Sequence, residues 1–410
     1  MKILWLISGP GTLFVIIVTM IVLFGCKRNE EIIPEPGPTS DWICLGGDSS
    51  ALNANGAIFT LCTDKAGNVY AAGSFVMSND NYFGVAKWDG TRWSELGSGN
   101  NGIHAIFYIL TLCTDREGNI YAAGYFPNAA GYFYVAKWDG SNWSELGSGN
   151  NALKADGMIN SICSDSAGNI YAAGDFSDIL IPPGLGLHYV AKWNGTSWSA
   201  LGTDSNALNR WGSAGPIYSL CTDRSGNVYA AGAFSDSTFQ HYVAKWNGTR
   251  WEQLGKGSNA LNPNYYLWSI CPDSEGNIYT ARGFANPVWL NCYISKWNGT
   301  NWEDLGKGSN GSLFASDIRS ICTDRSGNVY VAGSFENAKG KNYVAKWDGT
   351  SWIELGGIEK GLKANARINS ICLDAAGNVY AAGWFTNTHC YNPAGEKSGK
   401  INRQSIYLLL

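Results

Sequence analysis

The amino-acid sequence predicts an all-β fold of seven similar four-stranded units, because two sequence blocks recur along most of the chain. One copy of the first block reads IYSLCTDRSGNVYAAGAF at residues 217–234, and one copy of the second reads VAKWDGTRWSELG at residues 85–97. The turn glycine of the first block recurs at Gly67, Gly118, Gly168, Gly226, Gly276, Gly327 and Gly377. A period of about 50 residues in a chain of 410 residues indicates a repeat architecture.

The first block predicts the first two strands of each unit, joined by a tight turn. In the copy at residues 217–234 the strands cover 217–223 and 227–234. Asp223 can accept hydrogen bonds from the backbone of the turn, and Gly226 can take the positive φ that the turn requires. Small residues in the second strand indicate that a neighbouring sheet approaches closely there.

The second block predicts the other two strands, joined at Asp-Gly or Asn-Gly, the strongest short signal for a type I′ hairpin. In such a two-residue hairpin Trp88 pairs with Thr91, and Ala86 pairs with Trp93. Because side chains alternate along a strand, the two tryptophans become diagonal neighbours on one face. We interpret the tryptophans at these positions as packing between units rather than as platforms for sugars.

Sheets that are apolar on both faces and repeat at this period are the blades of a β-propeller. The stretch DWICLGGDSSALN at 41–53 matches SWSALGTDSNALN at 197–209, so it predicts a lone fourth strand that starts at Trp42. The last apolar stretch, SIYLLL at 405–410, is the expected third strand of that blade. We therefore expect residues 42–410 to form a single seven-bladed β-propeller of four-stranded antiparallel blades. Pairing of the N-terminal strand into the C-terminal blade closes the ring and leaves no open edge.

Both blocks resemble known propeller repeats. The pattern D-x-x-G-N-[VI]-Y-x-A-G-x-F is similar to the repeats of bacterial seven-bladed propellers. The pattern VAKWDG-x-x-W-x-x-LG resembles the repeats of fungal cortical polarity-marker proteins and their bacterial surface relatives. These resemblances imply a binding or scaffolding function, and they bring no shared catalytic residues with them.

The N-terminal region predicts export from the cytoplasm. A long apolar run at residues 3–25 follows Met1-Lys2, and Leu23-Phe24-Gly25-Cys26 resembles the lipobox of bacterial lipoproteins. We expect a signal peptide at 1–25, lipidation of Cys26, and an extended tether at 26–41. The alternative is an uncleaved membrane anchor, because about 20 apolar residues can span a bilayer. Both interpretations place the rest of the chain outside the cytoplasm. With a lipidated Cys26 we expect it in the bacterial cell envelope, anchored at the outer membrane or cell surface.

Composition and motifs exclude several kinds of chemistry. The 29 Lys and Arg residues and 33 Asp and Glu residues are mixed along the chain, without the basic stripe that nucleic-acid binding needs. No catalytic motif and no metal-ligand spacing occurs, so we expect no cofactor, no metal site and no enzymatic activity. The Asp-x-x-Gly-Asn segments are better explained as turns than as calcium loops.

The positions of the cysteines indicate that most of them have a structural role. Seven share one strand position and are interpreted as small buried apolar residues: Cys62, Cys113, Cys163, Cys221, Cys271, Cys322 and Cys372. Cys44 and Cys390 both fall in the seventh blade, and whether they form a disulfide stays open.

The candidate binding residues lie in the loops that enter the first strand or join the second strand to the third. These loops share one face of a propeller and vary most between the repeats, which suits recognition. The candidates are His188, Arg210, Trp211, Tyr265, Tyr266, Trp289 and Phe314. The leading hypothesis is a monomeric lipoprotein whose propeller binds a macromolecular partner, a protein or a polysaccharide. The alternatives are a carbohydrate-binding propeller and a propeller enzyme, either a lyase or a glycosidase.

Overall fold

The computed structural model describes most of the predicted propeller. The described residues are 42–47, 51–52, 54–77, 82–177, 189–202, 206, 208, 215–261, 266–285, 290–306, 314–386 and 406–409. The chain divides into two compact units, Met1–Ser40 and Asp41–Leu410, and all described residues belong to the second. The expected signal peptide, the tether and Cys26 lie outside the described residues and stay predictions. Among the residues described, no helix is long and apolar enough to cross a membrane.

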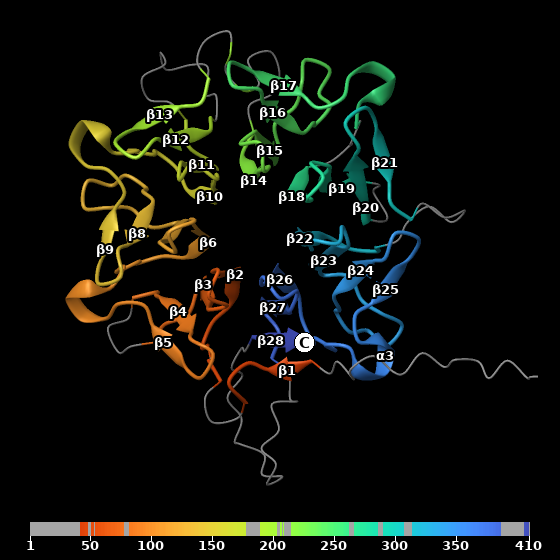
Figure 1. The fold of residues 1–410 in the computed structure, drawn as a ribbon, viewed down its shortest axis with the longest axis horizontal. Helices are drawn as coiled ribbons and strands as arrows, with labels where there is room; N and C mark the ends of the chain where they lie inside the picture. Colours follow the sequence, from red (N-terminus) through yellow and green to blue (C-terminus); the bar gives the residue numbers. More distant parts are fainter. Residues whose placement is uncertain are drawn as a thin grey trace, which may run out of the picture. The chain divides into compact units, whose positions relative to one another are not determined.

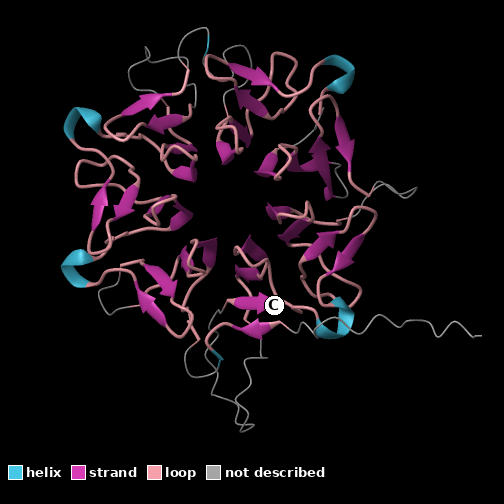
Figure 2. Ribbon diagram, viewed as in Figure 1, coloured by secondary structure: helices cyan, strands magenta, loops and turns pink. Residues whose placement is uncertain are grey.

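Seven four-stranded antiparallel sheets form a ring around a central opening (Figure 1). The first strand of each blade lines this opening, and the fourth lies at the periphery (Figure 2). The first six blades are β2 (Ile58–Thr63), β3 (Val69–Gly73), β4 (Val85–Trp88) and β5 (Trp93–Glu95); β6 (Ile109–Thr114), β7 (Ile120–Gly124), β8 (Ala136–Trp138) and β9 (Trp143–Glu145); β10 (Ile159–Ser164), β11 (Ile170–Gly174), β12 (Ala191–Trp193) and β13 (Trp198–Ala200); β14 (Ile217–Thr222), β15 (Val228–Gly232), β16 (Ala244–Trp246) and β17 (Trp251–Gln253); β18 (Leu267–Pro272), β19 (Ile278–Ala285), β20 (Leu290–Trp297) and β21 (Trp302–Asp304); and β22 (Ile318–Thr323), β23 (Val329–Gly333), β24 (Ala345–Trp347) and β25 (Trp352–Glu354). Among the described residues, short helices follow the fourth strands of blades 1, 2, 4 and 6 at the edge of the ring: η1 (Gly99–Asn101), η2 (Gly149–Asn151), η4 (Gly257–Asn259) and α3 (Gly357–Lys360). The predicted all-β fold of seven four-stranded blades is confirmed.

The seventh blade joins the two ends of the propeller. It consists of β26 (Ile368–Leu373), β27 (Val379–Gly383), β28 (Tyr407–Leu409) and β1 (Ile43–Cys44), in that order from the centre outward. The register aligns Ile43 with Leu408 and Cys44 with Tyr407. The predicted closure of the ring by an N-terminal strand is therefore confirmed.

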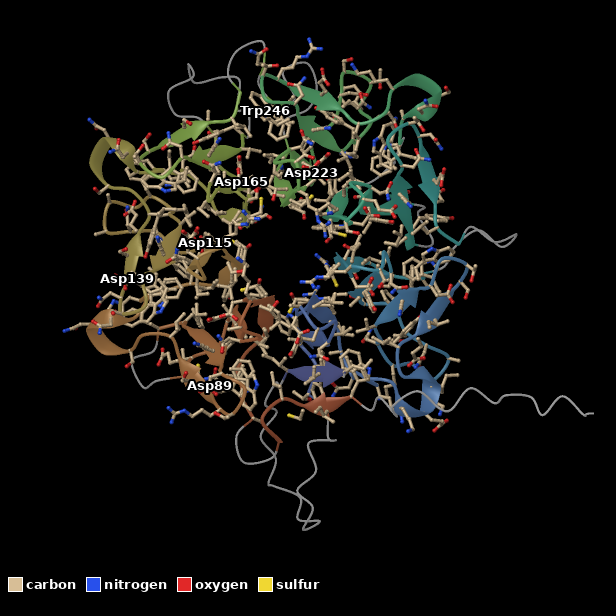
Figure 3. All side chains as sticks on the ribbon, viewed as in Figure 1. Asp89, Asp115, Asp139, Asp165, Asp223 and Trp246 are labelled. Atoms are coloured by element: carbon tan, nitrogen blue, oxygen red, sulfur yellow. The ribbon has the colours of Figure 1, made fainter. Side chains whose placement is uncertain are left out.

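The end of each blade at the turn between the first and second strands, which we call the turn face, repeats the same polar arrangement. In blade 3, Asp165 accepts hydrogen bonds from the backbone of Ala167 and Asn169, from the side-chain amide of Asn169 and from the hydroxyl of Tyr171. Gly168 has a φ of 83°, as the turn requires. Figure 3 labels Asp165 beside the inner strands, with the equivalent Asp115 and Asp223 in the neighbouring blades. The aspartate thus organises a turn, as the sequence predicts.

The hairpin between the third and fourth strands differs from the prediction. Trp88 pairs directly with Trp93, with ring centroids 5.7 Å apart, so the two are opposite neighbours rather than diagonal ones. The predicted type I′ turn is wrong, because it requires positive φ at two residues and only Gly90 of this loop has it. The Asp89 carboxylate accepts hydrogen bonds from the backbone of Thr91 and Arg92, which stabilises a four-residue loop instead. The prediction that both tryptophans share one face is confirmed.

The fourth-strand tryptophans link neighbouring blades. The indole Nε1 of Trp93 donates to the carbonyl of Leu45 in blade 7, at 3.1 Å. The same bond recurs from Trp143 to Leu96, Trp198 to Leu146, Trp251 to Leu201, Trp302 to Leu254, Trp352 to Leu305 and Trp42 to Leu355. Trp42 thus occupies the predicted equivalent position, although it and the other six are only partly buried. Their interpretation as packing between blades is confirmed.

Candidate ligand-binding rim on the loop face

A β-bulge lies at the start of every first strand. This end of the blades is opposite the turn face, and we call it the loop face. In blade 1, Ile58 pairs with Gly73 and Thr60 with Ala72, so Phe59 has no partner across the ladder. The register shifts in the same way in the other six blades. Because the first strands line the central opening, the bulged residues surround it on the loop face (Figure 1). The seven bulged residues, together with the neighbouring loop-face side chains that pack around them, form what we call the axial rim; the seven are Phe59, Leu110, Asn160, Tyr218, Trp268, Arg319 and Asn369.

The residue after each bulge fixes the first strands to one another. Thr60 Oγ1 accepts a hydrogen bond from the backbone N–H of Leu112 in the next blade, at 3.2 Å. Equivalent bonds to a Thr or Ser hydroxyl continue through every blade, and the last runs from Leu61 N–H to Ser370 Oγ at 3.0 Å. The rim is therefore positioned by a closed ring of hydrogen bonds that uses only repeated residues.

An aromatic group occupies the rim at blades 4 and 5. Tyr218 stacks on Trp268 with ring centroids 4.5 Å apart and an interplanar angle of 14°. Tyr266, one of the candidates from the sequence, contacts both rings edge-on at 6.1 and 6.2 Å. His241 lies 5.2 Å from Tyr266, and its Nδ1 is 2.9 Å from the carbonyl of Phe234. Each of the four rings contacts at least one of the others and is also partly exposed to solvent.

Two arginines continue the rim at blades 6 and 7. The Arg319 guanidinium lies 4.5 Å from the Trp268 ring centroid, and its Nε donates to the Asp317 carboxylate. Arg367 Nε donates to the Asn369 side-chain oxygen at 2.9 Å. The Asn369 amide in turn donates to the carbonyl of Ile58 in blade 1, at 2.8 Å. Each guanidinium is thus held in place through its Nε atom.

The charges of this region act on one another. Burial and the neighbouring Arg319 charge lower the pKa of Arg367, while Asp317 opposes the shift. Burial alone would raise the pKa of Asp317, but hydrogen bonds from Ser334 and the charges of Arg319 and Arg367 outweigh it and leave the pKa lowered. Asp317 is therefore ionised at neutral pH and faces two cations.

Exposed aromatic side chains extend the rim through blades 7, 1 and 2. Trp384 is 50% exposed and lies 6.0 Å from the Arg367 guanidinium. The centroid of the Phe59 ring lies 6.4 Å from that of Trp384 and 5.8 Å from that of Tyr108. Tyr108 is 45% exposed. Phe107 and Tyr125, also exposed, lie 5.0 Å apart beside them. We call Trp384, Phe59, Tyr108, Phe107 and Tyr125 the aromatic strip.

Of the two candidates from the sequence that lie among the described residues, the structure brings Tyr266 into this region and Phe314 into the core. Phe314 is 2% exposed and packs 4.4 Å from Phe335 and 5.4 Å from Trp352, so it lies in the core and offers no surface to a ligand. Its backbone pairs with Cys292, where the equivalent position in other blades is an alanine such as Ala105. The remaining candidates lie outside the described residues: His188, Arg210, Trp211, Tyr265 and Trp289.

The sequence interpretation missed the rim arginines and most of its aromatic side chains, although a signal for them exists. The bulged position is different in nearly every blade, while the positions after it repeat as Thr or Ser, then Leu or Ile, then Cys. The position two residues before the bulge varies as well and includes Tyr108, Asp317 and Arg367, whereas an Ile or Leu stands directly before the bulge in every blade. A variable column inside a repeated block therefore marks the surface that the fold itself does not determine.

The seven repeated cysteines pack in or against the apolar clusters between blades, where Cys221 and Cys271 are buried and the other five are partly buried. Burial raises the pKa of the Cys62 thiol well above its usual value, with smaller contributions from Cys372 and Asp64. Cys390 lies outside the described residues, so the disulfide with Cys44 stays open. Across the described ranges, no group of three or more His, Cys, Asp or Glu residues is arranged to hold a metal ion.

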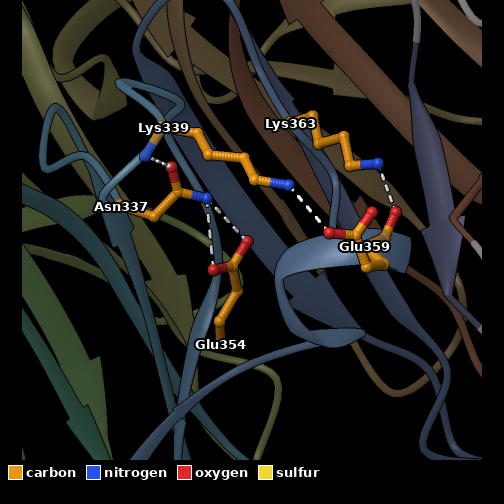
Figure 4. A network of polar contacts seen from close by, with 5 residues as sticks. All are labelled: Asn337, Lys339, Glu354, Glu359 and Lys363. Atoms are coloured by element: carbon orange, nitrogen blue, oxygen red, sulfur yellow. Dashed lines mark hydrogen bonds and ion pairs between the residues drawn. The ribbon is translucent and has the colours of Figure 1, made fainter.

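A separate polar network closes the outer part of the loop face at blade 6 (Figure 4). The Asn337 amide donates to both carboxylate oxygens of Glu354, at 3.0 and 3.2 Å. Lys339 Nζ lies 2.8 Å from a Glu359 carboxylate oxygen, and Lys363 donates to the Glu359 backbone carbonyl. These contacts tie the β23–β24 loop to β25 and α3, so the side chains satisfy one another and are not the best candidates for a ligand.

Comparisons with known proteins define the class of fold. No family model matches the chain, and no curated protein matches it. The extracellular domain of a putative hybrid two-component system from B. thetaiotaomicron is similar with a TM-score of 0.54 and 11% identity, over 90% of this chain and 39% of that one. PorZ, a surface component of the type IX secretion system of Porphyromonas gingivalis, has a TM-score of 0.50 and 13% identity, over 80% of this chain and 46% of that one. A family 25 polysaccharide lyase, an ulvan lyase, has a TM-score of 0.50 and 13% identity, over 90% of this chain and 96% of that one. At such low identity the likeness shows the fold alone, and the chain is a seven-bladed β-propeller.

Proposed function

We propose that this chain is a binding propeller of the bacterial cell envelope, whose loop face receives a macromolecular partner at the axial rim. The observation that carries the proposal is the aromatic strip. Its ring contacts run from Trp384 through the partly exposed Phe59 to Tyr108, and the exposed Phe107–Tyr125 pair belongs to the same blade as Tyr108. The turn face, by contrast, carries the same polar turn in every blade. Contiguous exposed aromatic side chains on a soluble domain mark interaction sites.

The proposed location rests on the N-terminal sequence. The apolar run at residues 3–25 and the lipobox-like segment ending at Cys26 support export and lipid anchoring. The extracellular domain and the surface component among the similar structures agree with that location. Mass spectrometry of the mature N-terminus should find acylated Cys26. An intact Met1 terminus would contradict lipid anchoring and would favour the uncleaved anchor.

We further propose that the chain binds without catalysing a reaction. The rim carboxylate of Asp317 is engaged by Arg319, and its lowered pKa makes it a poor proton donor at neutral pH. Such a group orients a cation rather than transferring a proton. Turnover of a bound macromolecule by the wild-type chain would contradict this part of the proposal.

A capture experiment tests the binding surface. The tagged full-length protein is recovered from its native envelope, beside a variant with Tyr108→Ser and Trp384→Ser. The matched control carries Ile353→Ser and Ile358→Ser, which are equally exposed apolar residues away from the rim. We expect the wild type and the control to capture the same partner and the rim variant to lose it. Equal capture by all three proteins would show that the rim is not the binding surface.

A further inference from the structure

The two rim arginines have oriented guanidinium groups with donors to spare. Nε of Arg319 is used by Asp317, and Nε of Arg367 is used by Asn369. Within the described residues, the Nη atoms of both arginines have no hydrogen-bond partner. The Arg319 side chain is 31% exposed, and Arg367 is also reached by solvent. Two preoriented forks with open Nη donors match the paired oxygens of a carboxylate or a sulfate.

The local charge is unbalanced at the same place. Arg319 and Arg367 lie close enough for each charge to act on the other, and Asp317 supplies one compensating carboxylate. An anionic group bound between the two guanidiniums would relieve the repulsion that remains. The chain as a whole carries a net charge of −4, so this positive site is a local feature and not part of a general basic surface.

Aromatic rings flank the arginine pair on both sides. Trp268 lies against Arg319, and Trp384 lies 6.0 Å from Arg367 with half of its surface exposed. Beyond Trp384 the aromatic strip continues through Phe59 to Tyr108. A sugar ring has an apolar face that packs on an aromatic ring and a polar edge that can carry a carboxylate or a sulfate. One acidic sugar can therefore stack on Trp384 while its charged edge meets Arg367.

We propose that the axial rim binds an acidic polysaccharide, with carboxylate or sulfate groups at Arg319 and Arg367 and sugar rings on Trp384 and the neighbouring aromatic strip. This inference rests on the proposed function of the loop face and specifies its ligand class. A polysaccharide fits better than a nucleic acid, because phosphate-backbone binding relies on many clustered cations, and the described residues of this rim include two, Arg319 and Arg367. It fits better than an acidic peptide, because the rings of Trp384, Phe59 and Tyr108 follow one another and suit a chain of repeating ring units.

Affinity measurements with defined polymers test the proposal. The full-length protein in detergent is titrated with polygalacturonate, which carries carboxylates, with dextran sulfate, and with uncharged dextran. An oligothymidylate serves as the nucleic-acid probe, and polyglutamate as the acidic peptide. The rim variant carries Arg319→Gln and Arg367→Gln. The control carries Arg224→Gln and Arg325→Gln, exposed residues on the turn face that give the same change in net charge.

We expect the wild type to bind polygalacturonate or dextran sulfate, and whichever binds more tightly identifies the anionic group. The rim variant should lose about tenfold or more in affinity, as expected when charge-assisted hydrogen bonds are removed, while the control keeps its affinity. Tighter binding of dextran, oligothymidylate or polyglutamate would overturn the proposal, and so would equal losses in both variants. Thermal melts of both variants show whether a loss of binding comes from unfolding, and Arg319→Lys tests the fork separately from the charge.

The result is separable from the test of the proposed function. If no acidic polysaccharide binds while Tyr108→Ser and Trp384→Ser still abolish capture from the envelope, the ligand class is wrong and the binding surface is right. If those two substitutions also leave capture unchanged, the proposed function is wrong as well.

Discussion

The two ends of the first strands show opposite relations between sequence and structure. At the turn face every blade has the same aspartate, glycine, asparagine and tyrosine in one hydrogen-bonded turn, as Asp165 and Tyr171 illustrate. At the loop face, a few residues away along the same strands, the bulged residues include Phe59, Trp268 and Arg319. The repeated end determines the blade, and the variable end is left available for recognition.

Lysines of the third strands add to the repeated end. Lys87 Nζ lies 5.9 Å from the centroid of the Tyr70 ring, and Lys137 has the same relation to Tyr121 at 5.7 Å. The arrangement recurs in blades 3 to 6. The lysine of the VAKW segment therefore covers the tyrosine that bonds the turn aspartate, which explains a charged residue inside an otherwise apolar repeat.

The difference between the turn face and the loop face predicts that substituting a repeated turn residue lowers the free energy of unfolding the most. Asp165→Ala removes an acceptor that is bonded to Asn169 and to the buried hydroxyl of Tyr171. We expect the free energy of unfolding to fall by about 2–4 kcal/mol, because a buried donor loses its charged partner. Urea melts of the variant and the parent measure the change. A loss below the error of the melt would mean that the repeated turn does not stabilise the blade.

The pH dependence of stability sharpens that test. Burial alone would raise the pKa of Asp165, but the hydrogen bonds from Asn169 and Tyr171 outweigh it and lower the pKa in the folded state. The same direction holds for Asp64, Asp115 and Asp324. A depressed folded pKa gives stability that is present above the unfolded pKa, about 3.9, and is lost as the pH falls through the folded value. Between pH 5 and pH 3 the parent should therefore lose more stability than Asp165→Asn, and identical slopes would contradict the assignment.

The sequence predicted most of the repeated framework, because each repeated residue has one physical role in every blade. The match of residues 41–53 to 197–209 located Trp42 and the closing strand. The register of the Trp88–Trp93 hairpin was wrong, because the Asp89 side chain stabilises a longer loop than Asp-Gly alone indicates. The rim was missed, because a bulge interrupts the alternation from which strand faces are inferred.

A smaller loss of stability is expected for a substitution in the strand that closes the ring. Trp42 donates its indole N–H to Leu355 at 3.2 Å, and its side chain packs partly buried between blades 6 and 7. Because the burial is partial, Trp42→Ala should cost about 1–3 kcal/mol, less than the value for a fully buried tryptophan. Trp143→Ala, at the equivalent position inside a continuous blade, is the matched variant. A thermal melt in which Trp42→Ala equals the parent, while Trp143→Ala is destabilised, would show that the closing strand does not contribute.

The smallest effect is expected at the rim, where one substitution can be made at two positions of the same strand. Leu110 is the bulged, partly exposed residue of β6, whereas Leu112 is 6% exposed and packs between blades 1 and 2. Leu110→Asn gives blade 2 the rim residue that Asn160 provides in blade 3, so the free energy of unfolding should change by less than about 1 kcal/mol. Leu112→Asn places an amide in the apolar cluster and should cost about 3 kcal/mol. Urea melts of both variants measure the difference directly. Comparable losses would mean that the rim is part of the packed framework, and the distinction between a repeated end that builds the blade and a variable end that binds would no longer hold.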